Sequence, residues 1–341
     1  MARKSSAAEP ILHRAARIED AINRWREKRG RKRGLVTTII PYAGYGAPAW
    51  ARVLCRVVLS SGAGAPSRAA KVRGWRSFFS IPVDDEVIAE IGGVRHRLQP
   101  DRSGIIDAVV DVDLKPGWNT VVLSTADTEP VTAGLFIVDP NAAFGIISDV
   151  DDTVMVTALP RPFLAAWNTF VLDEHARTPV AGMSVLYDRL ARANPGAPII
   201  YLSTGAWNVA PTLSRFMSRN LYPRGPMLLT DWGPTADRIF RSGQEHKRTS
   251  LERIAREFPG TKWLLIGDDG QHDPEIYREF AAEHPENVAA IAIRQLSPGE
   301  AVFAGGRSRE GSADETGVTW IAAPDGAGLY EQLVTSGLLR A

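Results

Sequence analysis

The sequence lacks the features that mark secreted and membrane-spanning proteins. It has one cysteine, Cys55, in 341 residues, so no disulfide can form within the chain, and a reducing compartment is favoured. No apolar run approaches the roughly 18 residues of a transmembrane helix, and the N-terminus lacks the apolar core of a signal peptide. These absences predict a cytoplasmic protein and leave peripheral association with a membrane open.

Charge is balanced over the whole chain but not within it. Residues 1–34 carry eleven Lys and Arg against four Asp and Glu, a local net charge of +7, so the rest of the chain sums to −6 at a total of +1. Apolar residues recur there at helical spacing, which predicts a basic amphipathic helix followed by a linker at 30–34. They are Ile11, Ala15, Ile18, Ile22 and Trp25.

Two interpretations of this basic segment stay open. Residues 11–33 would suit peripheral contact with an anionic membrane, where each cation near the surface contributes about 1 kcal/mol. Alternatively, the segment is a solubilising tail, or its apolar stripe docks on the protein's own surface. We do not expect nucleic acid as a partner.

A β-rich region is predicted from 35 to 140. Short runs rich in Val and Ile are separated there by turns containing Gly and Pro. In residues 105–114, apolar side chains alternate with Asp107, Asp111 and Asp113, as in a half-exposed antiparallel strand. This pattern favours a small antiparallel β-sandwich. The expected strands are 35–40, 51–59, 87–91, 105–114 and 120–123.

Strands and helices alternate from 141 to 341, which predicts an α/β domain with a mostly parallel sheet covered by helices. Ligands of such sheets bind at the carboxyl ends of the strands, so the residues at those ends matter most. The expected strands are 143–148, 199–203, 227–230, 262–267 and 288–293. The expected helices are 183–193 and 248–258.

Acidic residues follow two of these strands. The first strand continues into Asp149-Val150-Asp151-Asp152-Thr153, and the fourth continues into Asp268-Asp269, with Asp273 close behind. Carboxylates this close raise one another's pKa unless a cation neutralises them, and Mg²⁺ prefers a few carboxylates with water and phosphate oxygens.

Hydroxyls and a lysine complete the predicted site. The second strand ends in Ser203-Thr204-Gly205, and Lys247 is expected at the start of the helix before the fourth strand. Acids, hydroxyls, a lysine and a metal are the groups that phosphoryl transfer requires.

The motifs resemble a known family. Asp149-Val150-Asp151-Asp152-Thr153 resembles the signature of the haloacid dehalogenase (HAD) superfamily of phosphatases. The stretch 263–277, together with Tyr201-Leu202-Ser203, Trp207 and His246-Lys247, is similar to the catalytic domain of App1-type phosphatidate phosphatases. Residues 41–46 are similar to the N-terminal segment of bacterial relatives. The resemblance to the catalytic domain covers residues 141–296 and implies a HAD-like Rossmannoid domain.

The resemblance also implies roles. Asp149 would be the nucleophile and form an aspartyl-phosphate, while Asp151 would protonate the leaving alkoxide and then activate water. Thr153 would orient this loop. The phosphoryl oxygens would be held by Ser203, Thr204 and Lys247. Mg²⁺ would be held by Asp149, Asp268 and the backbone carbonyl of Asp151, supported by Asp273.

Two residues depart from the family pattern. Asp269 stands where a small residue is expected and adds a charge that would alter metal binding. Ala206 precedes Trp207 where relatives often carry Pro, which changes the geometry of the phosphate-side loop.

Three functions are therefore considered. The first is a Mg²⁺-dependent phosphatase acting on phosphatidate or a related lipid phosphate, which the absence of a large lid and the apolar stretch 155–171 support. The second is a phosphatase of the same mechanism acting on a soluble substrate or a phosphoprotein. The third is an adaptor that binds membranes or nucleic acid through its basic segment, which the intact acid set disfavours.

Overall fold

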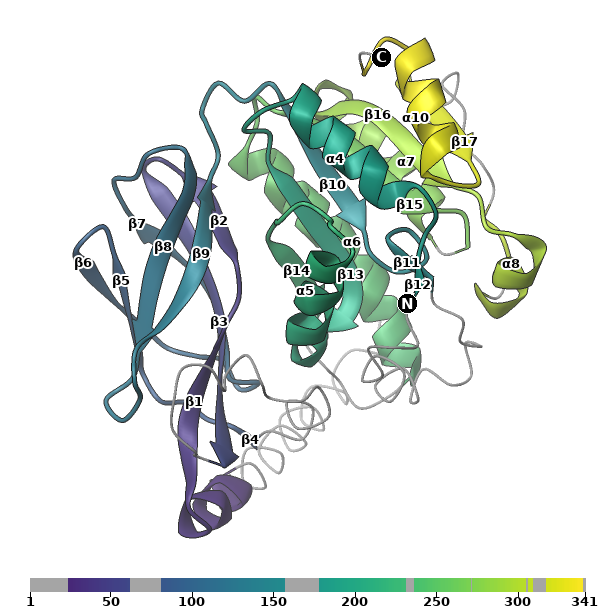
Figure 1. The fold of residues 1–341 in the computed structure, drawn as a ribbon. Helices are drawn as coiled ribbons and strands as arrows, with labels where there is room; N and C mark the ends of the chain where they lie inside the picture. Colours follow the sequence, from purple (N-terminus) through teal and green to yellow (C-terminus); the bar gives the residue numbers. More distant parts are fainter. Residues whose placement is uncertain are drawn as a thin grey trace, which may run out of the picture.

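The chain folds into an antiparallel β-sheet region beside an α/β domain (Figure 1). The computed structural model describes residues 24–61, 81–156, 178–230, 236–270, 272–304, 306–308 and 317–339. Most of the predicted basic helix at 11–25 and most of the apolar stretch 155–171 lie outside these residues, so the structure does not test either prediction.

The strands of the β-rich region are hydrogen-bonded into one nine-stranded sheet, and the expected arrangement as a sandwich stays a prediction. The strand order of this sheet is β1-β3-β2-β9-β8-β5-β6, with β4 and β7 also paired to β3. The 12-residue β3 pairs with different strands along its length, with β7 over its first half and with β1 over its second half. The strands of the sheet are β1 Leu35–Pro41, β2 Gly44–Ala47, β3 Trp50–Ser61, β4 Ile81–Pro82, β5 Val87–Ile91, β6 Val94–Leu98, β7 Ile105–Asp111, β8 Gly117–Ser124 and β9 Val131–Ile137.

The alternation predicted for residues 105–114 is confirmed. Ile106 and Val110 are buried in the core between the curved halves of the sheet, while Asp107 and Asp111 are exposed. The five predicted strands all form, but β2, β4, β6 and β9 were not predicted. One of them, β2, pairs with β9 in parallel through Gly44 and Leu135, a long-range pairing that no local pattern encodes.

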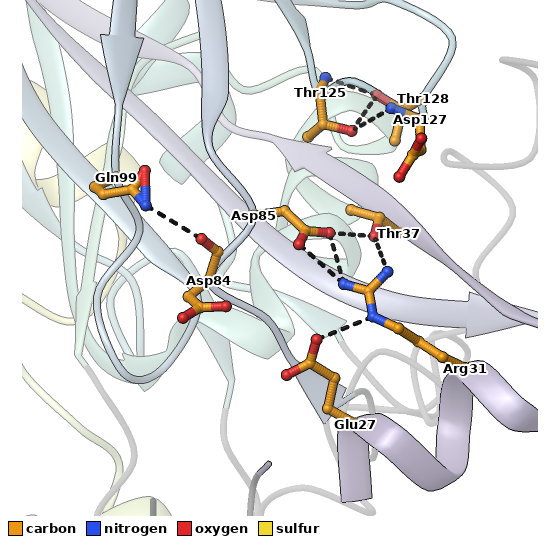
Figure 2. A network of polar contacts seen from close by, with 9 residues as sticks. All are labelled: Glu27, Arg31, Thr37, Asp84, Asp85, Gln99, Thr125, Asp127 and Thr128. Carbon is orange, nitrogen blue, oxygen red and sulfur yellow. Dashed lines mark hydrogen bonds and ion pairs between the residues drawn. The ribbon is translucent and has the colours of Figure 1, made fainter.

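A helical segment, residues 24–32, is docked on this sheet, where the sequence predicted a linker from 30. Gly30 is buried close to the side chains of Leu59 and Ile81. The Arg31 guanidinium donates to both carboxylate oxygens of Asp85 at 2.9 and 2.8 Å and to Glu27 at 2.9 Å, as Figure 2 shows. The basic segment is therefore fixed to the sheet at its C-terminal end.

The α/β domain contains a parallel sheet in the order β14-β13-β10-β15-β16-β17. In chain order this is 3-2-1-4-5-6, a doubly wound sheet whose direction of winding reverses at β10. Its strands are β10 Phe144–Asp149, β13 Ile199–Ala206, β14 Met227–Thr230, β15 Lys262–Asp268, β16 Val288–Arg294 and β17 Thr319–Ala323. The first five were predicted, and β17 was not. A small hairpin, β11 Met155–Val156 with β12 Thr178–Pro179, follows β10 in the chain.

Helices cover both faces of this sheet (Figure 1). Helix α4 (Met183–Ala193) packs with α10 (Gly326–Thr335), and α6 (Ala236–Glu257) packs with α7 (Asp273–Glu283) on the other face. The domain also contains α5 (Ala210–Arg219) and α8 (Pro298–Ala304). Helix α6 begins 12 residues before the predicted 248, so Lys247 lies in the middle of this 22-residue helix and not at its start. Among the described residues, no helix is both long and apolar enough to cross a membrane.

The two regions share a buried core. Residues of β1–β3, such as Tyr45 and Leu54, belong to the same hydrophobic cluster as the helices and strands of the α/β domain. The Tyr45 ring lies 6.0 Å from that of Phe258, and polar contacts to Glu257 come from the Tyr45 hydroxyl at 2.8 Å and from Arg52 at 2.6 Å. The antiparallel region is therefore packed firmly against the end of α6.

Because Gly145 of β10 packs closely against Trp263, one added methyl group at Gly145 should lower the stability of the fold. A Cβ at Gly145 would lie 2.4 Å from the buried ring of Trp263. Gly145→Ala should lower the free energy of unfolding by about 1–3 kcal/mol because a filled core tolerates overpacking poorly. The measurement is denaturant unfolding.

Gly260→Ala is the matched control, since no atom lies within 4 Å of a Cβ there. It should change the free energy of unfolding by less than about 0.5 kcal/mol. Equal stability of the two variants would contradict the packing described at β10.

Candidate active site

The acidic residues lie where two neighbouring strands end. Asp149 is the last residue of β10 and Asp268 is the last residue of β15. These strands pair in parallel, so their carboxyl ends meet at one edge of the sheet. Because the winding reverses at β10, a crevice is expected at this edge, where doubly wound sheets bind their ligands.

Three carboxylates and one ammonium group form the centre of the site. Asp149, Asp268 and Asp273 each place a carboxylate oxygen within 4.8 Å of the others. They are 1%, 0% and 0% exposed. The Lys247 Nζ lies 2.6 Å from Asp149 Oδ1 and donates to Asp273 Oδ1 at 2.5 Å. Thus α6 and α7 supply two members of the cluster, and two strands supply the others.

The electrostatics of this cluster favour a bound cation. Burial, together with Asp273 and Asp151, raises the pKa of Asp149, although Lys247 opposes this shift. Burial and neighbouring carboxylates likewise raise the pKa of Asp268. Asp149 and Asp273 keep the pKa of Lys247 above its usual value in spite of burial. Lys247 is therefore a fixed positive charge in the site.

The residues present fit a divalent metal. Three ionised carboxylates and one ammonium group sum to −2, which one divalent cation would neutralise. Oδ2 of Asp149, Asp268 and Asp273 has no hydrogen-bond partner among the described residues, although each oxygen is buried. A buried carboxylate oxygen without a partner is costly, and all-oxygen ligands suit Mg²⁺.

Asp151 is held by the next strand. The Ser203 hydroxyl donates to Asp151 Oδ2 at 2.9 Å and accepts from the Gly205 N–H at 2.9 Å. Both side chains are buried, whereas Thr204 is half-buried at the same loop. In this arrangement Ser203 orients Asp151, a contact that the sequence did not predict. Its predicted contact with a phosphoryl group stays a prediction.

The loop after Asp149 has a tightly defined conformation. Asp152 has a φ of 56°, in the left-handed region that non-glycine residues rarely adopt. Its carbonyl accepts from Arg294 at 2.8 Å, and Arg294 is itself paired with Glu300 at 2.7 Å. Thr153 is fully buried in this loop. Arg294 was not predicted as a site residue, although its position at the end of β16 was a usable signal.

Asp269 is not part of the group formed by Asp149, Asp268 and Asp273, and its expected effect on metal binding stays a prediction. Its Oδ1 accepts from the Leu296 N–H at 2.8 Å, and its Oδ2 lies 3.6 Å from Arg307. Asp269 therefore fixes the segment after β16. His272 is also outside the cluster, with a side chain that is 41% exposed and 3.7 Å from Glu275.

A cavity of about 870 Å³ lies between the antiparallel region and the α/β domain. Tyr42, Met217, Tyr222 and Arg224 are among the residues that line it. None of the clustered acids lines this cavity, so it is separate from the candidate active site. The clustered acids and Lys247 at the ends of β10 and β15 therefore remain the candidate active site.

Comparisons with known proteins concern the part of the chain that contains this site. The sheet order defines a doubly wound α/β domain, and the candidate site contains three clustered carboxylates and a lysine. Residues 144–295 match the family described as phosphatidate phosphatase APP1, catalytic domain. The predicted resemblance of this part of the chain to the App1-type catalytic domain is thus confirmed.

Two curated relatives match the same part of the chain. Phosphatidate phosphatase APP1 of Saccharomyces cerevisiae is 27% identical over 154 residues, which is 45% of this chain and 26% of the relative. An uncharacterized protein of Schizosaccharomyces pombe is 31% identical over 162 residues, 47% of this chain and 26% of the relative. The chain therefore spans about a quarter of the length of these relatives.

Solved structures add nothing to the assignment of the fold. A glycosyl hydrolase family 2 member from Bacteroides cellulosilyticus is 12% identical and aligns over 90% of this chain and 41% of its own, with a TM-score of only 0.24. A likeness at this level carries no argument.

Replacing one buried carboxylate should distinguish the effect of charge repulsion on stability from the effect of metal binding on stability. Asp268→Asn should raise the melting temperature of the metal-free protein because burial and like charges disfavour its carboxylate. The same variant should lose the stabilisation by Mg²⁺, which for the unchanged protein is about 2.7 kcal/mol at a hundredfold excess over the dissociation constant. Thermal unfolding with and without Mg²⁺ measures both effects.

Asp113→Asn, at an exposed position in the antiparallel region, is the control and should leave both quantities unchanged. Full Mg²⁺ stabilisation of Asp268→Asn would contradict the assignment of Asp268 as a ligand.

Proposed function

We propose that this protein is a Mg²⁺-dependent phosphomonoester hydrolase of the HAD-like kind, which acts through an aspartyl-phosphate intermediate. The observation that carries the proposal is the convergence of three buried carboxylates and Lys247 at the ends of β10 and β15. The match of residues 144–295 to the App1-type catalytic domain supports it.

Asp149 supplies the nucleophile. Its Oδ1 is paired with Lys247, and a carboxylate has two oxygens, so one would hold the metal while the other attacks. A bond forms between this oxygen and phosphorus as the bond from phosphorus to the substrate alkoxide breaks. Lys247 stabilises the negative charge at the reacting centre because its ammonium group is fixed and shielded from water.

Asp151 manages the protons of both steps. Oriented by Ser203 at 2.9 Å, it donates a proton to the leaving alkoxide as general acid. As a carboxylate, it then accepts a proton from the water that attacks the phosphorus of phospho-Asp149. Inorganic phosphate leaves, and both side chains return to their starting states.

Asp149, Asp268 and Asp273, with the Asp151 carbonyl, would hold the Mg²⁺ ion, which supplies charge neutralisation for the phosphoryl group when bound. The chain's own lysine cannot replace this ion, because it leaves a net charge of −2 on the cluster.

The substrate we propose is phosphatidate or a related lipid phosphate. The support is the name of the Saccharomyces cerevisiae relative, together with a basic surface that suits anionic lipid. Six cationic side chains of the docked helical segment and its end are exposed, and Trp25 beside them is 60% exposed. The cations are Arg24, Arg26, Lys28, Arg29, Lys32 and Arg33. We propose peripheral membrane contact through this face and a cytoplasmic location.

The roles assigned to Asp149 and Asp151 predict losses of phosphatase activity of different size. Asp149→Asn should remove phosphate release from phosphatidate in anionic vesicles, since no nucleophile remains. Asp151→Asn should lower kcat by about 10²–10⁴-fold, the usual contribution of a general acid and base. Phosphate release with Mg²⁺ and after chelation measures these effects.

A small soluble phosphomonoester serves as the comparison substrate. If turnover of both substrates depends on Asp149, the mechanism is supported. If the soluble substrate is hydrolysed as fast as phosphatidate and vesicles do not stimulate the reaction, the lipid assignment is overturned. Activity of Asp149→Asn near that of the unchanged protein would overturn the mechanism.

The basic face predicts salt-sensitive binding to anionic vesicles. A combined Arg26→Gln, Lys28→Gln and Lys32→Gln variant should bind about 100-fold more weakly, because each cation contributes about 1 kcal/mol at such a surface. Vesicle co-sedimentation at low and high salt measures this loss.

A variant with equal charge removed elsewhere, Arg95→Gln, Arg97→Gln and Lys115→Gln, is the control and should bind normally. Equal weakening of both variants would show that net charge alone matters and would contradict a specific membrane-facing surface.

A further inference from the structure

A tyrosine of the antiparallel region contacts residues 203–207 at the end of β13, which we call the catalytic loop. Tyr42 lies between β1 and β2, and its ring stacks on that of Trp207 with 4.8 Å between centroids and 25° between planes. Its hydroxyl donates to the Trp207 carbonyl at 3.0 Å. The two residues are 8% and 6% exposed, so this contact is shielded from water.

The loop that Tyr42 contacts is weakly held by its own sheet. Strand β13 pairs with β10 as far as Leu202, and its pairing with β14 is interrupted between Leu202 and Ala206. No strand pairing is described for residues 203–205. Their position therefore depends on side-chain contacts, including the Thr230 hydroxyl, which donates to the Thr204 carbonyl at 2.9 Å.

This loop orients the general acid and base of the proposed reaction. Ser203 donates to Asp151 and accepts from the Gly205 N–H, and Trp207 begins the short turn that follows β13. A shift of Trp207 would reach the Ser203 hydroxyl through Ala206 and Gly205, because the Gly205 N–H donates to that hydroxyl. Errors of about 1 Å in such placements are costly for catalysis.

Tyr42 is itself firmly fixed. Its N–H donates to the Leu54 carbonyl of β3 at 3.1 Å. Next to it, β2 approaches β3 so closely that a Cβ at Gly44 would lie 2.3 Å from the Arg52 carbonyl oxygen. The tyrosine thus transfers the rigidity of the antiparallel sheet to the catalytic loop.

We infer that Tyr42 is a positioning residue for the Ser203–Asp151 pair, so that the antiparallel region is part of the catalytic unit and not only a separate recruitment module. The catalytic part of this inference rests on the proposed phosphatase function. The structural part does not, since it concerns only how residues 203–207 are held.

Tyr45 offers a matched control in the same seam. Its hydroxyl also crosses to the α/β domain, donating to Glu257 at 2.8 Å, and its side chain is also buried. However, Glu257 is the last residue of α6 and ten residues beyond Lys247. Tyr42→Phe and Tyr45→Phe therefore remove the same chemical group from the same interface, but only the first loses a contact with the catalytic loop.

The experiment compares these variants in the full chain. Tyr42→Phe should lower kcat by roughly tenfold, equivalent to about 1.4 kcal/mol of barrier, with KM and Mg²⁺ affinity changed less than about twofold. Tyr45→Phe should keep kcat within about twofold. Hydrogen exchange should become faster in a peptide covering residues 203–210 for Tyr42→Phe only.

The readouts separate two kinds of failure. If the unchanged protein releases no phosphate from any substrate, the proposed function fails, while hydrogen exchange still tests the positioning. Unchanged exchange in Tyr42→Phe overturns the inference, as does an equal fall of kcat and melting temperature in both variants. Faster exchange with unchanged kcat overturns the catalytic part.

Discussion

The arrangement of this protein depends on placing several like charges where water is almost absent. Asp149, Asp268 and Asp273 lie within a few ångströms of one another at about 1% exposure or less, and Lys247 offsets two of them, Asp149 and Asp273, with direct ion pairs. Charges removed from water in this way cost several kcal/mol each unless they are compensated. A divalent cation is the compensation that their charge and unpartnered oxygens favour, and a phosphoryl group bound beside it would then enter a strongly polarised site.

The fold brings these groups together from distant parts of the chain. The order of the parallel strands puts the ends of β10 and β15 side by side, while α6 and α7 add Lys247 and Asp273. The pairing of β13 with β14 is interrupted between Leu202 and Ala206, and contacts from outside the sheet hold this part of the chain. The contact of Tyr42 with Trp207 is part of the core that the antiparallel region shares with the α/β domain.

Much of the site could be predicted because its acids follow apolar strands directly in the sequence. The central strands of the parallel sheet are continuous apolar runs, and their ends point to one edge by the rules of such sheets. Helix α6 was predicted too short because the polar run around Gly243 hides its helical periodicity. The parallel pairing of β2 with β9 and the bond from Tyr42 to Trp207 join residues far apart in the chain, so no local pattern could predict them. The role of Ser203 toward Asp151 likewise required three-dimensional geometry.

The most direct test is the position of a bound metal. A crystal of the protein soaked in Mn²⁺, as a substitute for Mg²⁺, should give one strong anomalous peak in contact with carboxylate oxygens of Asp149 and Asp268, with Asp273 adjacent. The other acidic groupings in the described residues, such as Glu252 with Glu283 and His284, are more exposed and should bind the ion weakly. A peak at one of those groupings with none beside Asp149 would contradict the account.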